Sequence, residues 1–231
     1  ADLDAALDGV LFGVILNQGE ECVAGTRLLI EASVADDFVA RLIERSRRVV
    51  VGLPLDAETQ VGALIHAQHL ESVLNYIEIG KQEGARLVYG GERLTDNGLD
   101  KGFFVGPTIF TEVKPEHRIF REEIFGPVLT VTTFDTVEQA ITLANDTEYG
   151  LGNGLWTKDV DKALKLSQKL QSGTVFVNTY LETSPQLPFG GFKKSGYGRE
   201  NGVDGLREFM ETKSTFIKMG ERTPAVSYTH L

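Results

Sequence analysis

The stretch that decides the fold is residues 128–177, which read VLTVTTFDTVEQAITLANDTEYGLGNGLWTKDVDKALKLSQKLQSGTVFV. Val128 to Phe134 predicts a strand, and a helix start is indicated at Thr136, with Gln139 three residues on as in a capping box. There follow a strand over Leu151 to Trp156, a helix over Val160 to Leu170 and a strand over Thr174 to Val177. Strands separated by helices need crossover connections, which build a parallel sheet covered by helices.

The same alternation fills the N-terminal half. Apolar residues at three- and four-residue steps predict a helix started by Asp2 and ended near Asn17 and Gly19. The next elements are a strand over Thr26 to Glu31, a helix starting at Ser33, a helix over about His66 to Gln82 and a strand over Arg86 to Tyr89. We therefore expect the α/β class, with a mostly parallel sheet and helices on both faces.

Composition excludes several classes of protein. The 231 residues carry a formal net charge of −10 without a Lys/Arg block, which argues against nucleic acid or an anionic membrane as partner. No apolar run approaches the length of a membrane span, and Asp4 and Asp8 lie where a signal peptide is apolar. The single cysteine, Cys22, fits a reducing compartment, so we expect a cytoplasmic protein, and the chain reads as part of a longer one.

The C-terminal quarter departs from the alternation. A Pro- and Gly-rich stretch from Asn178 to Gly205 is longer than an ordinary loop and is a candidate wall of a site. Lys213 to Lys218 alternates around Phe216 and predicts an edge strand or a strand that pairs with a partner. Residues 221–231 have no pattern, and we expect a disordered or non-native tail.

Cys22 lies in the polar segment NQGEECVAGTR, residues 17–27. A lone cysteine is most often an inert small hydrophobe, but a position after a helix end and before small residues suits an accessible nucleophile. The neighbouring Glu20 and Glu21 would raise its pKa by repulsion unless they point away, so a group from elsewhere must activate the thiol.

Other candidate chemistry is weaker. His66 and His69 stand three residues apart without a third ligand, which favours an ordinary helix surface, and we expect no metal site. The glycine-rich stretch 189–200 lacks the lysine of a phosphate-binding loop. Glu122 and Glu123 precede the strand at Val128; as neighbours they point in different directions, so one of them could accept hydrogen bonds from a ribose, or both could be solvated.

Three segments in this order resemble the NAD(P)-dependent aldehyde dehydrogenase superfamily. They are the Asn-x-Gly-x-x-Cys loop that ends at Cys22, the Glu-Glu-Ile-Phe-Gly-Pro-Val segment from Glu122, and the Pro-Phe-Gly-Gly-x-Lys-x-Ser-Gly-x-Gly-Arg-Glu loop over 188–200. The resemblance covers Ala1 to about Lys218. It implies an NAD- or NADP-dependent oxidation of an aldehyde to a carboxylic acid through a cysteine thiohemiacetal and thioester.

The resemblance also implies roles for individual residues. Cys22 would be the nucleophile, and its N–H would form half of an oxyanion hole. Glu123 would hold the nicotinamide ribose, Phe125 would pack beside the nicotinamide, and Glu21 and Phe189 would line the substrate tunnel. Residues 1–205 would be the cysteine-bearing catalytic domain, and 206–220 an oligomerisation segment that forms a homodimer or homotetramer through 213–218.

Some family features are absent from these residues. The general-base glutamate of a Glu-Leu-Gly-Gly segment and the dinucleotide-binding domain are missing, so we expect this chain alone to be inactive. Glu20 stands where glutamine is common, and Thr183 where many members carry an aromatic tunnel residue. Two alternatives stay open: an enzyme that passes the thioester to coenzyme A, and a scaffold that oligomerises without catalysis.

Overall fold

The computed structural model describes residues 1–220, and most of the predicted helices and strands are present in it. The helices are α1 (Leu3–Ile15), α2 (Ala35–Ser46), α3 (Ala67–Gln82), α4 (Arg118–Arg121), α5 (Val137–Asn145), α6 (Val160–Ser167) and α7 (Gly202–Arg207). The strands are β1 (Arg27–Glu31), β2 (Arg86–Tyr89), β3 (Arg93–Leu94), β4 (Phe104–Val105), β5 (Thr108–Thr111), β6 (Val128–Phe134), β7 (Gly152–Leu155) and β8 (Thr174–Val177). Short 3-10 turns η1 to η4 occupy Leu16–Gly19, Ala32–Val34, Asp96–Lys101 and Lys193–Ser195.

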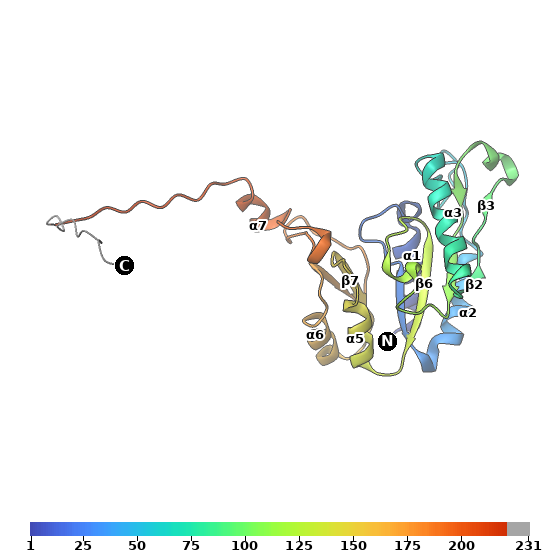
Figure 1. Ribbon diagram of the computed structural model, residues 1–231, viewed down its shortest axis with the longest axis horizontal. Coiled ribbons are helices and arrows are strands. Elements are labelled where there is room, and N and C mark those ends of the chain that lie inside the picture. The colour runs from blue at the N-terminus through green and yellow to red at the C-terminus, as the bar shows by residue number, and fades with distance from the viewer. Residues whose placement is uncertain (221–231) are drawn as a thin grey trace, which may run out of the picture.

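The largest sheet has four strands in the order β1-β6-β5-β2. β1 and β5 both pair with β6 in parallel, with Arg27 opposite Thr130 and Thr108 opposite Val128. β7 and β8 form a separate parallel pair, and β3 and β4 form an antiparallel pair. In Figure 1, β7, α5 and α6 lie to one side of β6, and α3, β2 and β3 lie to the other. The α/β class with a mostly parallel sheet is confirmed.

The structure differs from the expected sheet at β2, which runs antiparallel to β5. β5 was not predicted, and neither was the β3–β4 pair. The segment that leads from β4 to β5 is short, since β4 ends at Val105 and β5 begins at Thr108. The parallel strands also divide into two sheets where one was expected, because β7 pairs only with β8 among the described residues.

Helix starts follow local side-chain caps in two of the three predicted cases. Asp2 accepts a hydrogen bond from the N–H of Ala5, and Thr136 accepts one from the N–H of Gln139. The start predicted at Ser33 is wrong: this residue lies in a 3-10 turn, and α2 begins at Ala35 without a side-chain cap. Packing of Phe38 and Leu42 into the core supports α2 instead, since both side chains are fully or almost fully buried.

Two clusters of buried side chains hold the elements together. One joins α3 to β5 and β6 around Ile77, Phe110 and Phe120, and the other joins α1 and α2 to the opposite sheet face around Leu7 and Leu42. Each fully buried large aliphatic or aromatic side chain contributes about 1.5–3 kcal/mol of transfer free energy. These clusters fix the sheet whose strand ends carry the candidate site.

The last described residues leave the packed part of the chain. After α7, residues 211–219 are assigned neither helix nor strand, and in Figure 1 they run away from the other elements. Residues 206–220 are exposed, among them Phe209, Phe216 and Ile217. The strand expected over Lys213 to Lys218 is therefore not formed within the described chain, and the tail expected over 221–231 lies outside the described residues. Within residues 1–220, no helix has the length and apolar character needed to span a membrane.

Candidate active site

Three loops meet at one end of the parallel strands. The segment that carries Cys22 precedes β1, the Glu122–Pro127 segment precedes β6, and the turn at Tyr149 precedes β7. Because β1 and β6 are parallel neighbours, their amino ends lie at the same edge of the sheet. A cavity of about 150 Å³ lies there, lined by residues from the segments 19–27, 119–125 and 144–153 and by Ser195.

This cavity gathers four of the five predicted site residues: Glu21, Cys22, Glu123 and Phe125. Phe189 is not among the residues that line it. Its main chain instead forms an antiparallel bridge with Glu200, with both N–H groups donating at 2.7 Å. The Pro- and Gly-rich stretch still contributes to the cavity wall through Ser195, whose hydroxyl accepts the N–H of Gly150 at 2.9 Å.

The thiol of Cys22 is exposed and protonated at neutral pH. Partial burial raises its pKa first, and the negative charge of Glu21 raises it further. The Sγ–H donates to Glu21 Oε1 at 3.9 Å. Hydrogen bonding by the main-chain N–H groups of Cys22 and Val23 acts in the opposite direction and lowers the pKa.

The cysteine loop owes its shape to strained residues and a close contact. Asn17, Gln18 and Gly19 all have positive φ angles, of 50°, 50° and 77°. Asparagine and glycine tolerate this region, and the Asn17 side chain donates to the Glu20 carbonyl at 2.8 Å. Gly19 is buried with its main chain against Gly126, which brings the two loops together.

The adjacent carboxylates Glu122 and Glu123 have separate surroundings. Glu122 accepts two hydrogen bonds from Arg118, at 2.8 and 2.9 Å, and one from the Tyr76 hydroxyl at 2.9 Å. Hydrogen bonds from Arg118 hold the pKa of Glu122 below its usual range. Glu123 has no hydrogen-bond or ion-pair partner among residues 1–220, and it lines the cavity. Its carboxylate is thus free to accept hydrogen bonds from a bound molecule.

Tyr180 and Arg27 are site residues that the sequence did not reveal. The Tyr180 hydroxyl donates to the carbonyl of Val23 at 3.0 Å, and burial raises the pKa of Tyr180 to about 12. Its ring packs against three residues without side chains, Gly13, Gly25 and Gly154. These three glycines were the one feature of the sequence that could have indicated a buried ring here. They are scattered along the sequence, and only the fold brings them around Tyr180.

Arg27 is one of the residues that line the cavity. It donates to the carbonyls of Leu143 and Ala144 at the end of α5, at 3.3 and 2.9 Å, and its guanidinium lies 4.7 Å above the ring of Phe120. Burial lowers the pKa of Arg27 to about 10, so the side chain stays charged at neutral pH. It ties β1 to the carboxyl end of α5, where a cation also interacts favourably with the helix dipole.

The two histidines are not both on an ordinary helix surface, as the sequence had favoured. His66 is the N-cap of α3, where its side chain accepts the N–H of His69. The His69 side chain is only 16% exposed and contacts the Phe125 carbonyl. Among the described residues, no group of three or more His, Cys, Asp and Glu side chains is placed to hold a metal ion.

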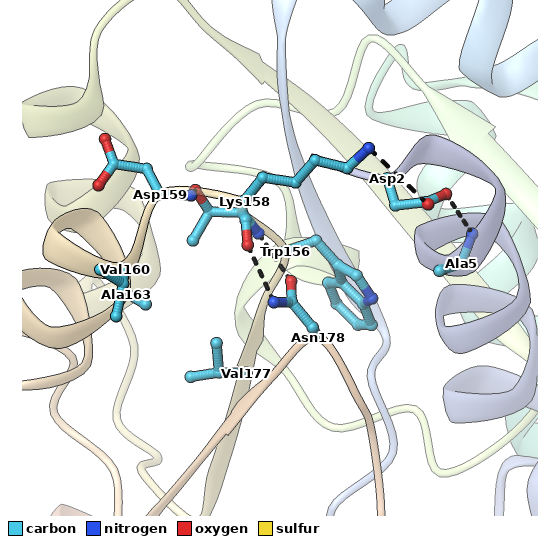
Figure 2. Close-up of a pocket in the computed structure, with 10 residues that line it drawn as sticks. Asp2, Ala5, Trp156, Lys158, Asp159, Val160, Ala163, Val177 and Asn178 are labelled. Carbon is cyan, nitrogen blue, oxygen red and sulfur yellow. Dashed lines mark hydrogen bonds and ion pairs between the residues drawn. The ribbon is translucent and has the colours of Figure 1, made fainter.

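A second, larger cavity of about 470 Å³ contains none of the predicted site residues. Figure 2 shows it between the start of α1 and the turn from β7 into α6, with Trp156 as its largest apolar side chain. Lys158 Nζ reaches to 4.0 Å from Asp2, and the Asn178 side chain bonds the main chain of Thr157. These polar groups are already paired with one another, which leaves little for a ligand to bind.

The side chains that line the smaller cavity have chemical groups that suit the nicotinamide end of a dinucleotide. Glu123 offers an unpartnered carboxylate for ribose hydroxyls, and Phe125, 36% exposed, offers an aromatic face beside Cys22. A phosphate-binding glycine-rich turn between a strand and a helix is not found among the described residues. The residues present thus suit one part of such a cofactor.

Comparisons with known proteins identify the family of the chain. Residues 1–215 match the sequence profile of the Aldehyde dehydrogenase family. The chain is 46% identical to the betaine aldehyde dehydrogenase of Bacillus subtilis (strain 168) over 216 residues, which are 94% of this chain and 44% of that protein.

Solved structures give the same result. An NAD-dependent aldehyde dehydrogenase from Sinorhizobium meliloti superposes with a TM-score of 0.92 at 42% identity, over 97% of this chain and 44% of that one. A point mutant of the betaine aldehyde dehydrogenase from Staphylococcus aureus, in complex with NAD+, superposes with a TM-score of 0.91 at 40% identity. The match covers 92% of this chain and 43% of that one. The chain thus spans less than half the length of these relatives. By sequence and by fold, the chain belongs to the aldehyde dehydrogenase family.

Proposed function

We propose that this chain is the cysteine-bearing part of an NAD-dependent enzyme that oxidises an aldehyde to a carboxylic acid. The observation that carries the proposal is the cavity that brings Cys22, Glu123 and Phe125 together from two loops. The chain has one cysteine, so Cys22 is its sole thiol nucleophile.

The reaction begins at Cys22. Its thiolate attacks the carbonyl carbon of the aldehyde, a C–S bond forms, and the carbonyl π electrons move to oxygen, giving a thiohemiacetal. The main-chain N–H of Cys22 donates to this oxygen as half of an oxyanion hole. Because partial burial and Glu21 keep the thiol protonated, its proton must leave to a base before or during the attack.

Glu123 and Phe125 hold the cofactor in this proposal. The Glu123 carboxylate accepts hydrogen bonds from ribose hydroxyls, and Phe125 packs against the nicotinamide. Bound NAD supplies the hydride acceptor that turns the thiohemiacetal into a thioester. Water then releases the carboxylic acid and restores the Cys22 thiol, so the sum is aldehyde, water and NAD+ to acid, NADH and a proton.

Substrate contacts complete the assignment. Glu21 lies in the cavity wall next to the thiol and is placed to contact an incoming aldehyde. Phe189 lies outside this cavity, so its role in a substrate tunnel requires surfaces that residues 1–220 do not form by themselves. The relatives named for betaine aldehyde make that compound a first substrate to test.

The rest of the enzyme lies outside these residues in this proposal. Since the chain spans about 44% of its relatives, a dinucleotide-binding domain and the water-activating carboxylate belong to a longer polypeptide, and residues 1–205 are its catalytic domain. The apolar side chains of residues 206–220, including Phe216 and Ile217, are exposed and suit pairing with a second subunit in a dimer or tetramer. The chain by itself is then inactive.

Two experiments test the proposal. In the 231-residue chain, betaine aldehyde or propionaldehyde should slow alkylation of Cys22 by iodoacetamide, followed by intact mass, whereas the matching alcohol should not. In the full-length protein, Cys22→Ala should abolish NADH formation and leave assembly intact. Activity that survives this substitution would show that Cys22 is not the nucleophile.

The same assay separates the alternatives. Acyl-coenzyme A formed in the presence of coenzyme A, with little free acid, would identify an acylating enzyme. No protection of Cys22 and no NADH formation, in a protein that still oligomerises, would identify a scaffold.

A further inference from the structure

The side chain of His69 bridges the two loops that form the site. Its Nε2 lies 2.7 Å from the carbonyl oxygen of Phe125 and 3.5 Å from Oε1 of Glu20. A carbonyl oxygen only accepts hydrogen bonds, so Nε2 carries a proton and donates to Phe125, and the Glu20 carboxylate lies within ion-pair distance of the same nitrogen. Glu20 is two residues before Cys22, and Phe125 is two residues after Glu123.

This contact is sheltered from water. The side chains of His69 and Glu20 are 16% and 10% exposed. Glu20 Oε1 also accepts the N–H of Ile65 at 3.1 Å, and Glu20 Oε2 accepts from the Gln18 amide at 3.3 Å. Hydrogen bonds to a charged group in a sheltered site are stronger than those between neutral groups on the surface.

Two further contacts hold His69 in place. The N–H of His69 donates to Nδ1 of His66 at the start of α3, at 3.0 Å. Its ring meets the Phe125 ring edge to face, with centroids 6.2 Å apart. Phe125 has a φ of 59°, an uncommon conformation for an aromatic residue, which persists only where surrounding contacts hold it.

We propose that His69 is a positioning residue that fixes the cysteine loop relative to the segment of Glu123 and Phe125. The inference rests on the proposed function, in which Cys22 carries the substrate and Glu123 holds the cofactor. Helix capping involves only the main-chain N–H of His69 and does not explain why its imidazole contacts both loops. Displacements of about 1 Å between reacting groups lower rates by about a hundredfold, so such a clamp acts on the rate of hydride transfer.

The first test compares His69→Leu, which removes the donor, with His69→Gln, whose amide N–H replaces it. In the full-length enzyme, His69→Leu should lower kcat by about tenfold or more, with KM for aldehyde and for NAD changed by less than about threefold. His69→Gln should restore kcat to within about threefold of the wild type. Gln68→Leu, at an exposed neighbouring position of α3, is the matched control and should leave kcat unchanged.

A second readout does not depend on the proposed function. Because Cys22 is the one cysteine, its alkylation in the 231-residue chain reports this loop alone. His69→Leu should speed alkylation by about threefold or more, since release of the loop relieves the partial burial that raises the Cys22 pKa, while His69→Gln and Gln68→Leu should match the wild type. Glu20→Leu should raise the alkylation rate by a smaller factor in His69→Leu than in the wild type, because the contact with His69 is then already lost and only those with Ile65 and Gln18 remain to be removed.

The outcomes are distinct. If the wild type oxidises no aldehyde, the proposed function fails, and the alkylation rates still decide the clamp. Equal alkylation in wild type and His69→Leu, or a kcat of His69→Gln as low as that of His69→Leu, would overturn the clamp. If His69→Leu does not fold, Glu20→Leu takes its place, with Glu20→Gln as the variant that keeps the acceptor.

Discussion

Gly19 lies directly against Gly126, so that a β-carbon on Gly19 would be 2.3 Å from the carbonyl carbon of Gly126. This is closer than any β-carbon contact that a folded protein tolerates, and the neighbouring atoms are main chain, which has little freedom to move. The cysteine loop and the segment before β6 therefore approach each other this closely only because Gly19 lacks a side chain.

Gly19→Ala should therefore destabilise the protein more than a positive φ alone explains. Gly84 has a φ of 92° but no atom near its β-carbon position, so Gly84→Ala isolates the conformational cost, about 1–2 kcal/mol. We expect Gly19→Ala to cost about 1–3 kcal/mol beyond that, measured by urea unfolding. Equal losses in the two variants would contradict the close contact.

Substitutions of the two adjacent glutamates, Glu122 and Glu123, should have different effects on the free energy of unfolding. Glu122→Gln should lower the free energy of unfolding at pH 7 by about 0.5–1 kcal/mol, since the ion pair with Arg118 is partly exposed. The folded-state pKa of Glu122 is lowered, so its contribution is present at neutral pH and is lost as the pH falls through that pKa.

Glu123→Gln is the matched variant. It removes a carboxylate without a partner among residues 1–220, so stability should stay within about 0.5 kcal/mol of the wild type. In the full-length enzyme, the same change should raise KM for NAD or lower kcat, because the ribose loses an acceptor. A Glu122→Gln enzyme with the larger loss of cofactor affinity would reverse the assignment.

Removing the charge of Glu21 should make the thiol of Cys22 more reactive. The negative charge and the accepted hydrogen bond both raise the Cys22 pKa, so Glu21→Gln should lower it and increase the thiolate fraction near neutral pH. The rate of alkylation by iodoacetamide against pH gives this pKa directly. Glu71→Gln, on the exposed side of α3, should leave the profile unchanged.

Tyr180→Phe should destabilise the cysteine loop. It leaves the Val23 carbonyl without its donor, at a cost of about 1–3 kcal/mol. Wild-type stability should also decline as the pH rises from about 10 through 12, because the buried phenol resists ionisation, and the variant should decline less. Tyr149→Phe, at a hydroxyl without a hydrogen-bond partner among the described residues, is the control.

Deleting residues from Lys213 onward should weaken self-association if this segment pairs with a second subunit. A chain that ends after Gly220 keeps the segment and serves as the control. Light scattering on both chains gives the masses, and an unchanged mass for the shorter chain would refute the pairing.

The sequence by itself determined most of the elements and the candidate nucleophile. Strands such as Val128–Phe134 and helix starts such as Asp2 and Thr136 follow from local periodicity and local caps, which need no knowledge of distant residues. Cys22 stood out because it is the one thiol and lies in a polar loop beside small residues. The ordered motifs then indicated the family, which the comparisons confirm.

Only the tertiary structure decided how these elements and residues combine. The antiparallel direction of β2 depends on its pairing with β5, and the start of α2 depends on core packing, which outweighs the weak capping pattern at Ser33. Glu122 and Glu123 both line the cavity, but Arg118 and Tyr76 bind the carboxylate of Glu122, whereas that of Glu123 has no partner among residues 1–220. His69 contacts Phe125, and Tyr180 contacts Val23, although each pair is far apart in the sequence. Such long-range contacts form only when the chain folds, so they leave no local sequence pattern.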